Sequence, residues 1–247
     1  RLIRVMEAGE VAHILESSPP RHRQVLWQLL ERDQEAEVLN DIGEELRSDF
    51  LQAMAPDEVA QITEELDDDD IADILQELPD AFTQKVLEAM DEQARLRLEK
   101  VLVYPEDSAG GLMNTDTVTI RADVTLDVVL RFLRRHEELP DMTDTLIVVS
   151  RDDRYVGLLP LRTLLVSDPG CSVRELMLTK RAPIPTDMPD DEVARLFERN
   201  DWISSPVVDE EGYLVGRITI DDVVDVIREY VDHSLMSMAG LTSTTAS

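Results

Sequence analysis

The sequence predicts an α+β protein, in which an all-α solenoid of short helices precedes a duplicated α/β domain and a C-terminal helix. Three observations support this fold class. Apolar residues recur with a twelve-residue period in the first part of the chain, a longer pattern occurs twice in the second part, and the turn-forming pair Gly110-Gly111 separates the two parts. A chain of 247 residues with 43% hydrophobic content can hold one or two domains with their own cores.

The twelve-residue period predicts the solenoid. Two apolar series run through it four residues apart, so each unit is predicted to be a short amphipathic helix that buries an i, i+4 pair. Acids or proline stand where these helices would begin, in stretches such as "APDEVA" and "LPDAFTQKVL". One unit would be unstable alone, so residues about 25 to 102 are expected to stack around a shared core. The series are Leu26, Val38, Phe50, Ile62, Ile74, Val86 and Leu98, and Leu30, Ile42, Met54, Leu66, Leu78, Met90 and Leu102.

The longer pattern predicts two copies of one α/β unit. The stretch "GLMNTDTVTIRADVTLDVVLRFL" aligns with "ELMLTKRAPIPTDMPDDEVARLF" 64 residues later, and "IVVSRDDRYVGLLPLRTLL" aligns with "PVVDEEGYLVGRITIDDVV" 59 residues later. The difference places five extra residues in the first copy, near "EELPDMTD". Each copy is predicted as strand, helix, strand, turn, strand and helix, with Gly157 and Gly216 at equivalent turns.

Charge and residue types exclude several classes of function. The excess of 53 Asp and Glu over 24 Lys and Arg residues argues against nucleic-acid binding and would concentrate cations. Cys171 is the only cysteine, so we expect no disulfide and no zinc cluster, and a cytosolic compartment fits best. The sequence shows no Ser/His/Asp or Cys/His set and no phosphate-binding glycine loop, so we expect no enzyme. It has no apolar run long enough to span a bilayer, and we expect a soluble piece of a longer chain.

The acids are concentrated in a way that predicts a metal site. Between Arg47 and Lys85 there are twelve Asp and Glu residues and no Lys or Arg. Carboxylates packed this closely repel one another, and a divalent cation would reverse the sign of their interaction. Asp69 and Asp73 are i, i+4 and would share a helix face, and Glu37 lies three units before Asp73 at the same repeat position. The alternative is that these acids are solvated or cap helices.

The sequence resembles the cytosolic region of the MgtE magnesium channel family, whose second half is a pair of cystathionine-β-synthase (CBS) motifs. The resemblance rests on the acidic short-helix domain, the junction "YPEDSAGGLM" and the final "DDVVDVIREYVDHSLMSMAGL". It implies an N domain over 1–103, a hinge over 104–113, CBS motifs over 114–170 and 171–229, and a helix from 230–247 that leads to an absent membrane pore. It also implies a homodimer at the cytoplasmic face of the cell membrane, which closes the channel when Mg²⁺ binds between the domains.

The resemblance singles out a set of Mg²⁺ ligands. Oxygen donors suit Mg²⁺, and also Ca²⁺ or Mn²⁺, better than zinc or copper. Asp191 and Asp201 would stand about 15 Å apart at the two ends of a helix, so several ions, or ions shared between subunits, are implied. The sequence departs from the family at Pro189, Glu198 and the pair His233-Ser234; for His233 we favour an exposed imidazole over a ligand. The implied ligands are Glu37, Asp69 and Asp73 in the first part, and Asp191, Asp201, Asp222 and Asp225 in the second.

CBS pairs often bind adenine nucleotides, which the second copy would do through Thr219 and Asp222. The first copy has Pro160 and Thr163 at the equivalent positions, so one of the two clefts is expected to be degraded. Trp202 would stack on the adenine, although a Trp beside a strand is more often core or dimer interface. We therefore expect a Mg²⁺ sensor that regulates a channel, with Gly110-Gly111 as hinge and the acids as latch. The alternative is a regulatory CBS module that senses adenine nucleotides such as ATP.

Overall fold

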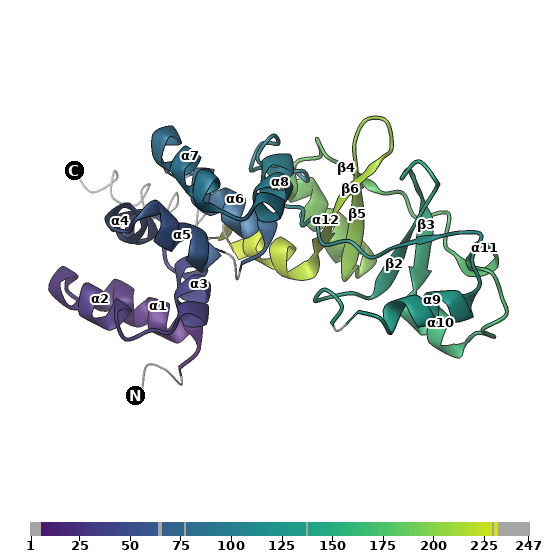
Figure 1. Cartoon of the computed structure of the whole chain (residues 1–247), viewed down its shortest axis with the longest axis horizontal. Coiled ribbons are helices and arrows are strands. Elements are labelled where there is room, and N and C mark those ends of the chain that lie inside the picture. The colour runs from purple at the N-terminus through teal and green to yellow at the C-terminus, as the bar shows by residue number, and fades with distance from the viewer. Residues whose placement is uncertain (1–5, 64–65, 77, 137, 229, 232–247) are drawn as a thin grey trace, which may run out of the picture. The chain divides into compact units, whose positions relative to one another are not determined.

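The structure is a computed structural model that describes residues 6–63, 66–76, 78–136, 138–228 and 230–231. The chain forms two compact units, which divide between Val103 and Tyr104 (Figure 1). The first unit is entirely helical in its described part, and the second contains all the strands, so the predicted α+β fold class is confirmed. His233 and Ser234 lie outside the described residues.

The first unit is the predicted solenoid. Its helices from α3 onward begin at Arg32, Glu44, Pro56, Asp68, Asp80 and Glu92, which reproduces the twelve-residue period of the sequence. Successive alternate helices pack on one another, α1 on α3, α3 on α5, α5 on α7, and α6 on α8. The helices are α1 (Ala8–Ser17), α2 (Pro20–Trp27), α3 (Arg32–Asp41), α4 (Glu44–Ala53), α5 (Pro56–Thr63), α6 (Asp68–Gln76), α7 (Asp80–Ala89) and α8 (Glu92–Val101).

The apolar series forms the core of this unit. Val38, Ile74, Val86 and Leu98 are fully buried, and each lies at the same place in its repeat. Helices of eight to ten residues cannot hold themselves together in water, so burial of these side chains against neighbouring helices stabilises the unit. The predicted stacking is therefore confirmed.

The second unit consists of two three-stranded sheets, one for each copy. In the first sheet β1 pairs parallel with β2 and β2 pairs antiparallel with β3, and the second sheet repeats this pairing. A helix that starts at residue 220 follows the last strand. The strands are β1 (Thr119–Arg121), β2 (Thr145–Val149), β3 (Tyr155–Pro160), β4 (Ile184–Pro185), β5 (Ser204–Val208) and β6 (Leu214–Thr219), and the helices are α9 (Leu126–Leu133), α10 (Leu161–Val166), α11 (Val173–Leu176) and α12 (Asp190–Asn200).

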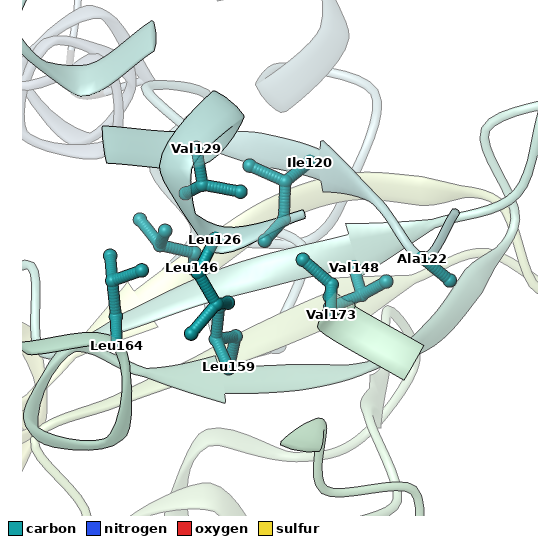
Figure 2. Packing of buried hydrophobic residues seen from close by; sticks show 9 residues of the cluster. All are labelled: Ile120, Ala122, Leu126, Val129, Leu146, Val148, Leu159, Leu164 and Val173. Atoms are coloured by element: carbon teal, nitrogen blue, oxygen red, sulfur yellow. The ribbon is translucent and has the colours of Figure 1, made fainter. Parts of the chain in front are cut away.

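Strand β2 is buried on both faces. Leu146 and Val148 point into a cluster with Leu126 and Val129 of α9, which Figure 2 shows from close by. The alternate residues Ile147 and Val149 join a second cluster, which includes Leu214 from the other copy. The near-continuous apolar run of this strand is explained by these two apolar surroundings.

The two copies are joined where the backbone of one crosses a strand of the other. Asn114, before the first strand of the first copy, bridges Arg217 of β6, and Leu178, before the first strand of the second copy, bridges Leu158 of β3. An added Cβ on Gly216 would lie 2.6 Å from the Asn114 carbonyl oxygen, and one on Gly157 would lie 2.7 Å from that of Leu178. The two glycines therefore permit these crossings by having no side chain.

The junction 104–113 packs as part of the second unit. The amides of Ala109 and Gly110 donate to the carbonyls of Met188 and Thr186 at 2.8 and 2.9 Å. A Cβ on Gly110 would lie 2.3 Å from the Tyr104 ring. The glycine pair is thus needed for close packing, and neither glycine has a positive φ. The pivot expected at this pair stays a prediction.

Gly216→Ala should lower the free energy of unfolding by about 1–3 kcal/mol, because the new methyl group would overlap the Asn114 carbonyl and force the crossing apart. Thermal or urea unfolding measures the change. Gly170→Ala is the control within the same unit, since its Cβ would meet only the tip of the Asp168 side chain at 3.2 Å. A Gly216 variant as stable as the Gly170 variant would contradict the crossing as the joining contact.

Candidate functional site

Three carboxylates converge at the start of α6 in the first unit. Asp67, Asp69 and Asp70 each offer an oxygen, and these oxygens lie within 4.8 Å of one another. The helix brings them together because its first turn closes at this point, where the Ile71 amide donates to the Asp67 carbonyl at 3.0 Å. Asp67 is exposed, Asp70 is half-buried and Asp69 is buried.

The surroundings of the cluster help to compensate its negative charge. The free amides and the dipole at the start of α6 favour carboxylates there. Arg97 of α8 forms an ion pair with the neighbouring Asp68 at 3.4 Å. Both Asp68 and Asp69 are less than a tenth exposed, and burying two carboxylates is costly unless charge or hydrogen bonds offset it.

The geometry of the cluster fits a hard cation. Octahedral Mg²⁺ holds oxygens at about 2.1 Å, which places neighbouring ligand atoms about 3 Å apart. The three oxygens lie within 4.8 Å of one another, and carboxylates are the donors that Mg²⁺, Ca²⁺ and Mn²⁺ prefer. Asp67, Asp69 and Asp70 would hold the ion.

The cluster overlaps the residues expected from the sequence only at Asp69. Asp73 lies one turn further along α6 and is half-buried, and Glu37 is exposed on α3. Among the described residues, the converging group includes neither of them. Asp67 and Asp70 were missed, although the run of acids was visible, because the i, i+4 rule selects a helix face and ignores the convergence of residues at a helix start.

The acids of the second unit are spread over two helices. Asp191 lies in the first turn of α12 and forms an ion pair with Arg195 at 2.6 Å. Asp201 follows the end of the same helix with a left-handed φ of 52° and is exposed. Asp225 pairs with Arg228 at 2.9 Å on the helix that starts at residue 220. Asp191 and Asp225 each form an ion pair with an arginine on their own helix.

Two of the expected departures from the family also have local explanations. Pro189 is the N-cap residue of α12, where its lack of an amide hydrogen costs nothing. Glu198 is exposed near the end of that helix. Neither residue forms part of the metal-type group found among the described residues.

Asp222 has a structural task. Its Oδ2 accepts hydrogen bonds from the Thr219 amide at 2.7 Å and from the Thr219 hydroxyl at 2.8 Å. Thr219 immediately precedes the helix at residue 220 and is therefore its N-cap residue. The hydrogen bond from its amide to Asp222, the third helical residue, is one of the two hydrogen bonds that make up a capping box. Asp221 accepts a further hydrogen bond from the same hydroxyl. Thr219 and Asp222, the residues expected to bind ribose, thus hold this helix start together.

The two residues at the equivalent place in the first copy differ in chemistry. Pro160 is the N-cap residue of α10 and has no side-chain hydrogen bond, and Thr163 lies inside that helix. The first copy therefore offers no carboxylate where the second has Asp222, as expected from the sequence.

Trp202 stands next to α12 and is half-buried. Its ring and that of Phe197 form an edge-to-face pair, with a centroid distance of 5.7 Å and an interplanar angle of 77°. The guanidinium of Arg181 lies over the ring, 4.1 Å from its centroid. The ring expected to stack on adenine therefore has a protein cation on one face.

A cavity of about 390 Å³ opens in the first unit, and sequence analysis did not identify it. Trp27 and Phe50 stack in its wall at 4.6 Å, and Arg32, Glu35 and Glu58 supply charge. Burial raises the pKa of Glu35, Arg32 lowers it, and Glu58 raises it further. Its acids lie on other helices than the α6 cluster.

Both halves of the chain match known families. The model for the MgtE intracellular N domain matches residues 6–107, and the model for the CBS domain matches 109–168 and 173–229. A solved structure of the cytosolic domain of the Mg²⁺ channel MgtE in complex with ATP is 37% identical, with a TM-score of 0.83 over 91% of this chain and 92% of that one. The chain belongs to the MgtE family.

The curated MgtE relatives are longer than this chain. The magnesium transporter MgtE of Thermus thermophilus is 42% identical over 60% of this chain and 33% of its own length. That of Bacillus subtilis is 33% identical over 85% of this chain and 44% of its own length. The chain thus spans less than half of each relative. A search of the described helices finds none with the length and apolar character of a membrane span.

The comparisons confirm three expectations. The helical domain and the CBS pair stand in the predicted order, the resemblance to the MgtE cytosolic region is confirmed, and the chain belongs to a transporter family and not to an enzyme family. A second neighbour, the soluble part of a magnesium transporter, shares the fold with a TM-score of 0.78 at 24% identity.

Asp222→Ala should destabilise the second unit by about 1 kcal/mol without any ligand, because the start of the helix at residue 220 loses its cap. Thermal unfolding in EDTA measures this cost. Asp225→Ala is the matched control on the same helix, since Asp225 contacts only a surface arginine among the hydrogen bonds and ion pairs found for it. Equal stability of the two variants would argue against the capping role of Asp222.

Proposed function

We propose that this chain is the Mg²⁺-sensing regulatory region of a magnesium channel or transporter. Mg²⁺ bound to acids of the helical unit and of the CBS unit favours a compact state, and that state corresponds to the closed pore. The observation that carries this proposal is the convergence of Asp67, Asp69 and Asp70 in a chain whose relatives transport magnesium. Membership of the family supports it further.

The charge of the chain supplies the physical mechanism. At a net charge of −29 the acidic surfaces repel one another in the absence of divalent cations. A bound Mg²⁺ reverses that repulsion locally, and a ligand that prefers the compact state shifts the population towards it. Because Mg²⁺ needs only one or two carboxylates and keeps several waters, scattered acids suit a sensor of modest affinity. Ca²⁺ or Mn²⁺ would be accepted by the same donors.

The finer assignment of ligands is part of the proposal. In the helical unit Glu37, Asp69 and Asp73 are the positions that resemblance singled out, and Asp67 and Asp70 join Asp69 on geometric grounds. In the CBS unit Asp191, Asp201 and Asp225 are the accessible candidates. Asp222 is a weaker candidate, since its Oδ2 already accepts two hydrogen bonds from Thr219.

The assembly is proposed to be a homodimer at the cytoplasmic face of a membrane, continued by a pore. Apolar side chains remain exposed on helices of the second unit, and a second copy would cover them. They are Val128 and Phe132 on α9, Leu165 and Val166 on α10, and Val224, Ile227, Tyr230 and Val231 after β6.

The alternative function is an adenine-nucleotide-sensing CBS module. A relative with 37% identity was solved in complex with ATP, which favours it. Thr219, Asp222 and Trp202 are the residues we propose for ATP. The two functions are compatible in one chain if ATP and Mg²⁺ bind to different groups.

Asp67→Asn combined with Asp70→Asn should remove most of the thermal stabilisation by Mg²⁺ at the α6 cluster. Ligand stabilisation is RT ln(1 + [L]/Kd), about 1.4 kcal/mol at ten times Kd, and it vanishes as Kd rises. The melting temperature is measured with and without Mg²⁺. Asp57→Asn combined with Asp80→Asn is the control, because it removes the same charge from the first turns of α5 and α7. Equal Mg²⁺ responses in the two variants would contradict the site.

Mg²⁺ at millimolar concentration should reduce the radius of gyration of the parent chain, because the compact state binds the ion preferentially. Small-angle scattering measures this, at a concentration where sedimentation fixes the oligomeric state. Asp225→Asn should weaken the compaction from the CBS side without loss of a cap, and adding it to the Asp67/Asp70 variant should cost less than the sum of the two effects. An unchanged radius of gyration in the parent chain would contradict the proposed Mg²⁺-dependent compaction.

A further inference from the structure

Several contacts hold Arg181 in place over one face of the Trp202 ring. The backbone of Arg181 is fixed where its carbonyl oxygen accepts a hydrogen bond from the Tyr155 hydroxyl at 2.8 Å. Its Nη2 donates to the Ser204 carbonyl oxygen. Burial of the Tyr155 hydroxyl raises its pKa to about 12, so it remains a donor at neutral pH. The cation is therefore anchored at its backbone and at its tip.

Arg181 is also incompletely paired. In the described part of the chain, no carboxylate oxygen lies within 4.0 Å of a guanidinium nitrogen of Arg181, so it forms no ion pair there. Its buried Nε also has no hydrogen-bond partner. Burial lowers the pKa of this guanidinium, and the more distant Asp144 raises it. Asp144 is itself bound by the Ser204 hydroxyl at 2.5 Å. The contact with the Trp202 ring is thus a principal partner of this cation, and other ligands of the ring must compete with it.

This arrangement occurs in the second copy alone. By the 64-residue alignment, the position of Arg181 in the first copy is Thr117, and by the 59-residue alignment that of Trp202 is Thr143. The duplicated backbone does not require a cation on a ring here. Arg181 and Trp202 are side chains that this copy has and the other lacks.

We propose that Arg181 is a built-in occupant of the Trp202 face that excludes a purine ring, so that an adenine nucleotide stacks on Trp202 only after Arg181 has left it. The inference rests on the proposed alternative function, in which Trp202 stacks on adenine. Displacing a partly desolvated cation–π contact opposes binding, and its removal should raise the affinity about tenfold, which corresponds to 1.4 kcal/mol. Arg181 thereby sets how strongly the CBS unit responds to ATP.

The test is calorimetric titration of the 247-residue chain with ATP in EDTA, which separates nucleotide binding from Mg²⁺ binding. Arg181→Ala should bind ATP about tenfold more tightly than the parent. Arg181→Gln, which retains a donor for the Ser204 carbonyl and loses the charge, should change affinity in the same direction and serves if the alanine variant unfolds. Arg154→Ala is the matched control, because Arg154 covers the ring of Tyr213 at 4.5 Å in the same unit. Its affinity should equal that of the parent.

The outcomes separate this inference from the proposed functions. Weaker binding by both Arg181 variants would show that the guanidinium contacts the phosphates, and unchanged binding would show that Trp202 is not where the base stacks; either overturns the inference alone. No binding of ATP by the parent or by any variant overturns both the inference and the nucleotide-sensing function. The stabilisation of these variants by Mg²⁺, measured separately, reports on the Mg²⁺ sensor and is expected to be that of the parent.

Discussion

The crossing of two backbones over Gly157 and Gly216 is the contact on which the second unit depends. Each copy contributes a three-stranded sheet, and the segment before the first strand of each copy bridges the last strand of the other copy's sheet. Close approach of main chain to main chain leaves no room for a Cβ, so the constraint acts on residue type directly. It also fixes β6, whose end carries Thr219 and, three residues on, Asp222.

The side chains next to the crossing differ between the two copies, so the two copies share a backbone arrangement but differ in their polar contacts. Next to the Asn114 crossing, Arg217 of β6 forms a two-bonded ion pair with Asp116 at 2.8 and 2.9 Å and also donates to the Asp141 carbonyl. At the other crossing, the alignments place Leu158 at the position of Arg217 and Lys180 at the position of Asp116. The buried arginine therefore ties the five-residue insertion of the first copy to the strand of the second. Duplication supplied the scaffold, and the polar residues diverged separately at each crossing.

Periodicity was sufficient to predict the fold, because both the twelve-residue repeat and the duplicated pattern mark residues that must be buried in every unit. Local chemistry was less complete. The acidic run pointed to a cation, yet the convergence of Asp67 and Asp70 with Asp69 depends on where α6 begins, which a face rule does not register. Arg181 over Trp202 is a contact between residues far apart in sequence, and no spacing rule encodes it.

Under the proposed function, the distribution of charge in the helical unit would make its stability depend on divalent cations, which that of a neutral solenoid would not. Twelve acids lie between Arg47 and Lys85 without a basic residue among them in the sequence, and Arg97 of α8 forms an ion pair with Asp68. Its short helices are stable only when stacked, so any net repulsion among these acids would weaken the contacts between repeats, and a bound counter-ion would relieve it. Lysines placed to form ion pairs with these acids would give a more stable solenoid, but its stability would no longer respond to Mg²⁺. The missing basic residues are therefore the feature that would make this unit responsive to a divalent cation.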